Sequence, residues 1–96
     1  MLRLSVTNNL NVTVEVDLKF DYDTKNEFIK ANEAEDFPYP YLSTLYIISA
    51  SVPGTNRTCI PYQPSDGLPY ISFSVNPFLA NPSNSTCIVQ QNIIVM

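Results

Sequence analysis

Two cysteines, Cys59 and Cys87, are the residues of this 96-residue chain best suited to covalent chemistry. They lie 28 positions apart, and each begins an apolar segment with the composition of a strand. A disulfide between them would close a loop of about 29 residues and stabilise the folded chain by about 3.6 kcal/mol. Such a bond needs an oxidising compartment, and the N-terminal residues lack the apolar segment of an export signal. The sequence therefore favours two small buried thiols, with a Cys59–Cys87 disulfide as the alternative.

The chain has no His, so it can form none of the catalytic dyads or metal sites that use imidazole. Carboxylates are therefore the remaining candidates for catalysis or metal binding. Asp21-Tyr22-Asp23 has the spacing that begins a calcium-binding loop, but later ligand positions hold Lys25 and Asn32, which do not suit the ion. Glu15 and Asp17 face open water along a predicted strand, whereas acid–base catalysis needs a cleft. We expect no enzymatic activity, no metal and no cofactor.

Three Asn-x-Thr triplets could accept N-glycans in a secreted protein: Asn11-Val12-Thr13, Asn56-Arg57-Thr58 and Asn84-Ser85-Thr86. The chain is rich in Asn, Ser and Thr, so that chance alone gives about 1.7 such triplets. The triplets therefore do not by themselves indicate glycosylation.

Charge is distributed unevenly along the chain, whose net charge is −4 and whose pI is near 4.4. This acidity argues against binding to nucleic acid. Residues 1–36 hold four basic and eight acidic residues, whereas residues 37–96 hold only Arg57 and Asp66. Interface cores are depleted in charge, so we expect residues 37–96 to form most contacts with other subunits and the charged face of 13–23 to stay in water. A compositional bias without functional meaning is the alternative.

The elements that must position these residues are mainly strands. Residues 12–23 alternate strictly between apolar and polar side chains, which predicts a half-buried strand. Residues 2–7 alternate too, and a loop at 8–10 would place Val6 opposite Val12 in an antiparallel hairpin. Thr24-Lys25-Asn26-Glu27 fits the capping box that begins a helix, so one short helix is expected near 25–35.

Further strands are expected at 41–52, 56–62, 70–76 and 86–96, separated by turns rich in Pro and Gly. The strand at 41–52 reads as central, and Pro61 marks the next one as an edge or a strand end. Residues 1–96 then form a single all-β domain, a small antiparallel β-sandwich or partly closed barrel of about six strands. Its expected core is Leu4, Val6, Val14, Val16, Leu18, Phe20, Ile47, Ile71, Phe73 and Val75.

Two groups of apolar residues are candidates for contact with partners. Aromatic side chains lie near the proline-rich turns, and the chain ends in four apolar residues that would be an aggregation hazard on a bare edge. The alternative for the aromatic side chains is that they pack the loops over the sandwich, and the alternative for the C-terminal residues is a central strand of the protein's own sheet. The candidate interface residues are Phe37, Tyr39, Tyr41, Tyr62, Tyr70, Ile93, Ile94, Val95 and Met96.

These patterns favour a non-enzymatic structural subunit that packs with other protein subunits, as a homo- or hetero-oligomer, into a larger assembly. A minor capsid, decoration or tail protein of a virion or other particle assembled inside the cell is the most natural setting, because the chain is short, poor in charge and shows no export signal. No apolar stretch is long enough to span a membrane. The alternatives are a secreted or cell-surface interaction module with a disulfide and N-glycans, and a glycan-binding module that uses exposed Tyr and Asn.

Overall fold

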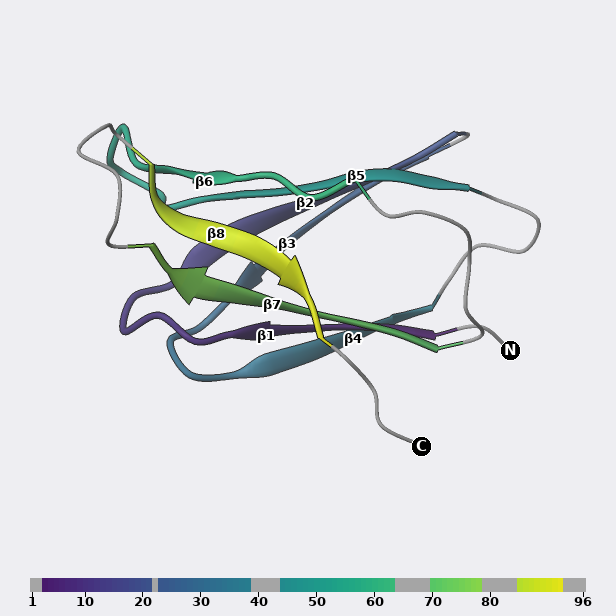
Figure 1. Ribbon diagram of the computed structural model, residues 1–96, viewed down its shortest axis with the longest axis horizontal. Helices are drawn as coiled ribbons and strands as arrows, with labels where there is room; N and C mark the ends of the chain where they lie inside the picture. Colours follow the sequence, from purple (N-terminus) through teal and green to yellow (C-terminus); the bar gives the residue numbers. More distant parts are fainter. Residues whose placement is uncertain (1–2, 22, 39–43, 64–69, 79–84, 93–96) are drawn as a thin grey trace.

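Eight β-strands make up the part of the chain that the computed structural model describes, which is residues 3–21, 23–38, 44–63, 70–78 and 85–92 (Figure 1). No helix occurs within these residues. The all-β expectation is confirmed, whereas the expected count of about six strands and the expected helix are wrong. The strands are β1 (Arg3–Asn8), β2 (Val14–Phe20), β3 (Thr24–Ile29), β4 (Ala34–Pro38), β5 (Leu45–Ser51), β6 (Thr58–Ile60), β7 (Tyr70–Pro77) and β8 (Ser85–Gln91).

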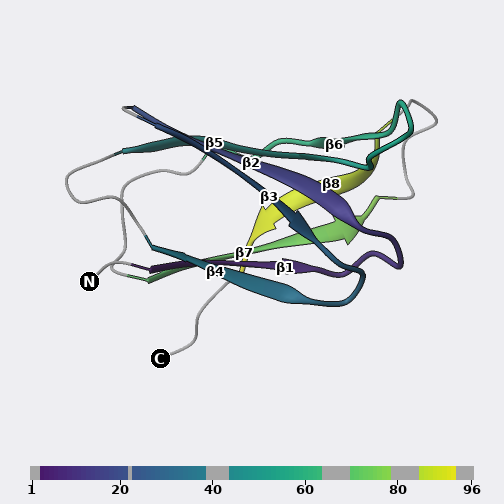
Figure 2. The same cartoon turned by 180° about the vertical axis from the view of Figure 1, so that it is seen from behind.

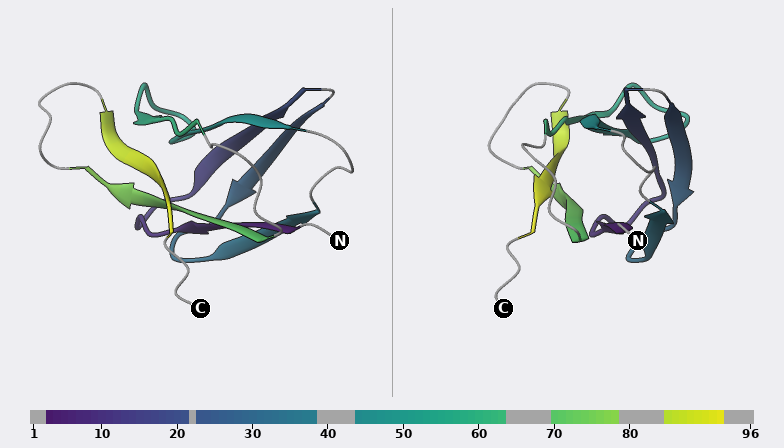
Figure 3. Two further views of the ribbon diagram at one scale, coloured as in Figure 1. Left: turned by 45° about the vertical axis from the view of Figure 1, so that its right-hand side comes forward. Right: turned by 90° about the vertical axis from the view of Figure 1, so that its right-hand side faces the viewer.

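The strands form one sheet that curls into a nearly closed barrel, in the order β3-β2-β5-β6-β8-β7-β1-β4. The end-on view in Figure 3 shows the strands around a ring. β3 and β4 are the two edges of the sheet, and Figure 2 shows them diverging from the turn that joins them. The pairs β1–β7 and β6–β8 are parallel, so the sheet is mixed rather than purely antiparallel. Parallel neighbours are distant in sequence, and no local turn signal predicts them.

The segment expected to be helical is instead β3, a turn and the start of β4. β3 pairs with β2 along its whole length, from Lys19↔Thr24 to Val14↔Ile29. The turn that follows has Asn32 at a φ of 62° and is closed by a hydrogen bond from the Glu33 N–H to the Lys30 carbonyl. An isolated helix of about eleven residues is marginal in water, whereas β2 offers β3 a ladder of backbone hydrogen bonds along its whole length.

β1 and β2 do not form the expected hairpin, because β1 pairs with β4 and β7 while β2 pairs with β3 and β5. The link between them crosses from one part of the sheet to the other, and the fully buried Asn8 holds it in place. Asn8 Nδ2 donates to the carbonyl oxygens of Val12, Ile29 and Lys30, at 2.8, 3.0 and 3.2 Å. Its Oδ1 accepts from the Leu10 N–H at 2.9 Å. One side chain thus joins the β1–β2 link to the turn between β3 and β4.

β5 is a central strand, as the sequence predicts, but its inward face differs from the expected one. The register between β2 and β5 shifts between Lys19 and Phe20, so that Tyr46 is an extra residue on β5. Such a β-bulge reverses the alternation of side chains along a strand. Ile48 is therefore fully buried, whereas Ile47, which was expected in the core, is half-buried.

Alternation along the other strands produces the core that the sequence predicts. The buried members of the expected set are Leu4, Val6, Val14, Val16, Leu18, Phe20, Phe73 and Val75. Ile71 lies on β7, and its side chain is outside the described part. Further buried side chains complete the interior, among them Ile29 of β3, Ile48 of β5 and Val89 of β8.

Candidate functional site

The two cysteines lie side by side on the parallel strands β6 and β8, which pair at Cys59↔Cys87. Their Cα atoms are 4.5 Å apart, and their sulfur atoms form a disulfide. This departs from the free thiols that the sequence favours, because proximity in the fold decides whether two cysteines can bond. β6 has three residues and pairs with β5 only at Ser51↔Thr58. The disulfide therefore fastens this short strand to β8, while its pairing with β5 stays limited to one position. Pro61 follows β6, which lies between two neighbours, so this proline marks a strand end and not an edge.

A row of amide and hydroxyl side chains covers the outer face of β7, β8 and the end of β1. Asn76 Nδ2 donates to Ser74 Oγ at 3.0 Å and to Gln90 Oε1 at 2.8 Å, and Asn76 Oδ1 accepts from Asn9 Nδ2 at 2.7 Å. The Ser74 hydroxyl donates to Asn92 Oδ1, and Asn92 Nδ2 donates to Ser72 Oγ, both at 2.9 Å. We name this uncharged set the amide–hydroxyl ladder: Asn9, Ser72, Ser74, Asn76, Gln90 and Asn92.

The strand register explains why these side chains meet. Phe73 and Val75 of β7 are buried, so the residues between and beside them face outward. Across the antiparallel β7–β8 pair, Ser74 lies directly opposite Gln90. Polar side chains opposite one another on neighbouring strands are close enough to hydrogen-bond, which is how two separate alternating segments become one network.

The amide–hydroxyl ladder satisfies much of its own hydrogen-bonding capacity. The Asn76 amide donates two hydrogen bonds and accepts a third. Ser74 is only 4% exposed, and its hydroxyl is hydrogen-bonded to Asn76 and Asn92. Among the described residues, no buried side-chain nitrogen or oxygen lacks a partner. Because these side chains already bond one another, desolvation of this surface costs less than that of amides bonded only to water. The ladder is therefore suited to contact with another protein surface.

The outer face of β2 and β3 is polar in a different way. Glu15 and Asp17 lie on the same side of β2, and Asn26 Nδ2 of β3 donates to Glu15 Oε2 at 2.6 Å and also to Asp17 Oδ1. The amide thereby bridges two carboxylates that would otherwise repel one another. Carboxylates lose far more hydration energy on burial than neutral amides do, so this face is suited to water.

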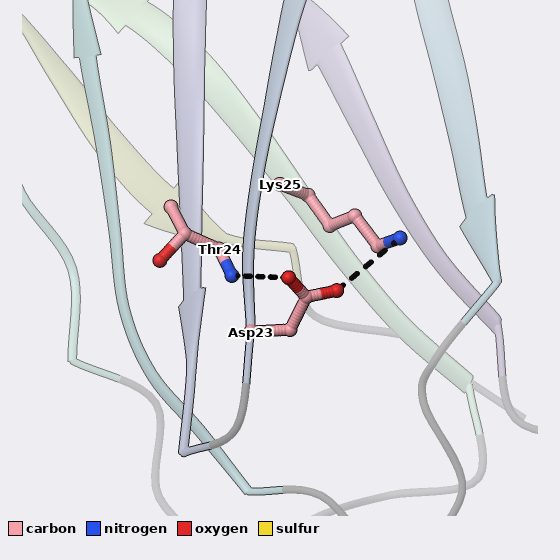
Figure 4. Close-up of polar contacts among 3 residues, drawn as sticks. All are labelled: Asp23, Thr24 and Lys25. Carbon is pink, nitrogen blue, oxygen red and sulfur yellow. Dashed lines mark hydrogen bonds and ion pairs between the residues drawn. The ribbon is translucent and has the colours of Figure 1, made fainter.

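The edges of the sheet are charged as well. Lys25 and Glu27 occupy inward positions in the alternation of β3, yet both are exposed. Figure 4 shows the start of this strand, where Asp23 Oδ1 accepts the Thr24 N–H at 2.8 Å and Asp23 Oδ2 lies 3.4 Å from Lys25 Nζ. An exposed ion pair of this kind contributes little stability. Inward-pointing charge on an edge strand does oppose pairing with a foreign strand.

The aromatic residues expected at an interface do not gather on one exposed surface within the described part of the chain. Phe37 is 7% exposed and belongs to the core. Tyr62 is half-buried, with its ring 5.5 Å from that of Phe73 and its hydroxyl donating to Gln91 Oε1 at 2.8 Å. Tyr70 begins β7, but its side chain lies outside the described part. The remaining candidates also lie outside the described residues: Tyr39, Tyr41, Ile93, Ile94, Val95 and Met96.

Two aromatic residues that sequence reasoning did not single out are exposed instead. Phe28 of β3 is 57% exposed and Tyr46 of β5 is 55% exposed. Tyr46 borders an open depression of about 500 Å³ together with Lys19, Thr44, Leu45, Ile47 and Gln63. Tyr46 follows the buried Leu45 in the alternation of β5, and the β-bulge, which depends on the register with β2, decides instead that Ile48 and not Ile47 is buried.

Neither a group of metal-ligating side chains nor a membrane-spanning helix occurs among the described residues. No three Asp, Glu or Cys side chains in this part of the chain are grouped as metal ligands. The same residues contain no helix of the length and apolarity that a membrane span requires.

Comparisons with known proteins add no family to this picture. No protein-family model matches the chain, and searches of curated proteins and of solved structures gave no match. The functional argument therefore depends on three features of the molecule itself: the amide–hydroxyl ladder, the charged face of β2 and β3, and the disulfide.

Proposed function

We propose that this protein is a non-enzymatic structural subunit that packs into a larger protein assembly through the outer face of β7, β8 and the end of β1. The observation that carries this proposal is the amide–hydroxyl ladder, an uncharged surface whose side chains already bond one another. Interface cores elsewhere are depleted in charge in the same way. The ladder replaces the expected aromatic surface as the contact region, and β7 and β8 belong to the charge-poor residues 37–96.

We infer that the partner at this face is a second copy of the chain. The whole net charge of −4 resides in residues 1–36, and Figure 1 places β2 and β3 in the opposite layer from β7. Two copies that meet through their ladders keep the carboxylates of β2 and β3 away from the contact. A symmetric pair of this kind is the commonest arrangement among oligomers of identical chains.

The setting that we propose is a virion, in which the protein would serve as a minor capsid, decoration or tail component. A shell requires subunits whose contribution is surface rather than catalysis, and small β-domains with Greek-key or barrel-like sheets are common in such shells. The ladder supports this role because it offers an uncharged contact on the face of the sheet, while the charged β3 and β4 edges oppose uncontrolled strand pairing.

The test introduces one positive charge into each of the two faces. Gln90→Lys places a charge in the ladder, and Thr24→Lys places a matched charge at an exposed position of β3. Sedimentation over a range of concentrations should show self-association of the unaltered chain, weakened at least about tenfold by Gln90→Lys because two lysines would meet across the contact. Thr24→Lys should have no effect. The homo-oligomer is contradicted if the unaltered chain stays monomeric, or if both variants lose self-association equally. If incorporation into a particle fails only for Gln90→Lys, the partner at this face is a different subunit.

A secreted or cell-surface interaction module is the second candidate function, and the Cys59–Cys87 disulfide favours it. Disulfides persist mainly in oxidising compartments, and both cysteines of the chain are used in this bond. Titration of free thiols in protein isolated under non-reducing conditions from its natural source distinguishes the settings. Absence of free thiols supports an extracellular location, whereas two free thiols per chain count against it.

A further inference from the structure

We propose that Asn11 and Asn56 are acceptors of N-linked glycans. Each begins an Asn-x-Thr triplet, with Thr13 and Thr58 as the hydroxyl residues. The proposal goes beyond the packing role and rests only on the oxidising compartment of the second candidate function. It concerns an end of the barrel and not the amide–hydroxyl ladder, so the two proposals can fail independently.

The side-chain amides of Asn11 and Asn56 are not engaged in the fold of the described residues. A glycan is joined to Nδ2, and an amide nitrogen already engaged in the fold cannot carry one without loss of that contact. Asn11 and Asn56 are both exposed, and neither side chain forms a hydrogen bond within the described part of the chain. The asparagines whose Nδ2 donates a hydrogen bond there begin no such triplet: Asn8, Asn9, Asn26, Asn76 and Asn92.

Asn32 is the exception that tests this distinction. It is exposed and its side chain is also unbonded among the described residues, yet Ala34 stands where a triplet needs a hydroxyl. The backbone explains why an asparagine occupies this position: its φ of 62° lies in the left-handed region, which Asn tolerates better than most residues. Among the described asparagines, the exposed and unbonded ones without a backbone reason are thus the two that begin Asn-x-Thr triplets.

Asn11 and Asn56 lie in two connections at the same end of the barrel. Asn11 lies in the link between β1 and β2, and Asn56 lies in the turn between β5 and β6. Figures 1 and 2 show these two connections at the same end of the barrel. Hydrogen bonds of Val52 with Thr55 and Arg57 close the β5–β6 turn, which leaves Asn56 exposed. Surface loops are where glycans are accommodated, and sequence spacing alone does not show that two triplets share one end.

The disulfide is consistent with the compartment in which N-linked glycans are attached. Glycan transfer to Asn and disulfide formation both occur in the lumen of the secretory pathway. Thr58 directly precedes Cys59, one of the two bonded cysteines. In the transfer, a lipid-linked oligosaccharide pyrophosphate donates its sugar: the bond from the sugar carbon to Nδ2 forms, the bond from that carbon to the pyrophosphate oxygen breaks, and Nδ2 loses one proton. No oxidant or reductant is needed.

The experiment secretes the full chain from a glycosylating eukaryotic cell, behind a cleavable leader. Asn84→Gln is introduced throughout, so that the count refers to the two triplets in question. Intact mass before and after treatment with peptide-N-glycosidase should show two glycans. Asn11→Gln and Asn56→Gln should each remove one, Thr58→Ala should match Asn56→Gln, and Thr58→Ser should retain both glycans.

A gain of function serves as the matched control. Ala34→Thr gives Asn32 a hydroxyl residue two positions later and should add a third glycan at the same end of the barrel. Glycans are attached as the chain enters the lumen, so protein retained in the cell is counted as well, and a variant that folds poorly still answers the question. A chain that carries no glycan at Asn11 and Asn56, in cells that glycosylate a co-expressed secreted reporter, overturns the proposal. Sedimentation of the chain that carries both Asn11→Gln and Asn56→Gln tests the packing role separately, because a glycan at Asn11 would lie two positions from Asn9 of the ladder.

Discussion

Asn26 and Asn76 are the same residue type on the outer faces of two strands of one sheet, and they show how differently the two faces are built. Asn26 bridges the carboxylates of Glu15 and Asp17, whereas Asn76 joins the neutral side chains of Asn9, Ser74 and Gln90. The first face holds charges that require hydration, and the second is a network that has already replaced much of its water. Polarity alone therefore does not tell whether a sheet face is meant for solvent.

The same comparison explains the uneven charge of the sequence. Edge strand β3 lies within the charged residues 1–36 and edge strand β4 begins there, while the charge-poor β5 to β8 lie between other strands. Edge strands present unpaired backbone groups, and charge protects them from pairing with other chains. Strands in the middle of the sheet need no such protection. Charge thus protects the edges β3 and β4, and the neutral side chains lie on β5 to β8, which have neighbours on both sides.

The largest effect should come from the core beneath the ladder. Phe73→Ala removes a fully buried ring that also contacts Tyr62, and should lower the free energy of unfolding by about 3–5 kcal/mol. Phe28→Ala makes the same change on the charged side, at a residue 57% exposed, and should lower it by less than about 1 kcal/mol. Denaturant unfolding measures both. Equal losses would contradict the assignment of Phe73 to the core.

The junction between the two regions should be nearly as sensitive. Asn8→Ala leaves three carbonyl groups and the Leu10 N–H without their side-chain partner in the interior, which should cost about 3 kcal/mol. Asn9→Ala, one residue later, removes a single exposed hydrogen bond and should cost about 0.5 kcal/mol. Unfolding midpoints of the two variants provide the comparison, and a mild effect of Asn8→Ala would show that the β1–β2 link is held by other contacts.

The smallest effects should differ most in their dependence on salt. Asn76→Ala removes three neutral hydrogen bonds and should cost about 1–2 kcal/mol at any ionic strength. Asn26→Ala exposes the repulsion between two carboxylates and should cost about 0.5 kcal/mol in dilute buffer, falling toward zero in 1 M salt, where screening acts within about 3 Å. Urea unfolding at both salt concentrations decides this. The same salt response in both variants would remove the proposed difference between the faces.

Much of the local structure could be predicted from the sequence, and little of the pairing could. Strict alternation placed Val14, Val16 and Leu18 in the core, because side chains of a strand point to opposite faces in turn. The helix expected near 25–35 was wrong, because a four-residue capping signal is weaker than pairing with a long strand. The sequence pattern predicted the outward Ser and Asn residues of β7, but the ladder itself depends on which strand lies beside them.

The amino-acid sequence by itself determined the all-β class, the charged and neutral regions, most of the core, and the absence of His-based chemistry. These follow from composition and from a two-residue period, both of which are properties of neighbouring positions. Tertiary structure alone decided the parallel pairs, the bulge that buries Ile48 in place of Ile47, the disulfide, and the meeting of Asn9 with Asn76 across 67 positions. Each of these depends on the register between segments that are distant in the chain, and that register is set by the packing of the whole barrel, not by any local pattern.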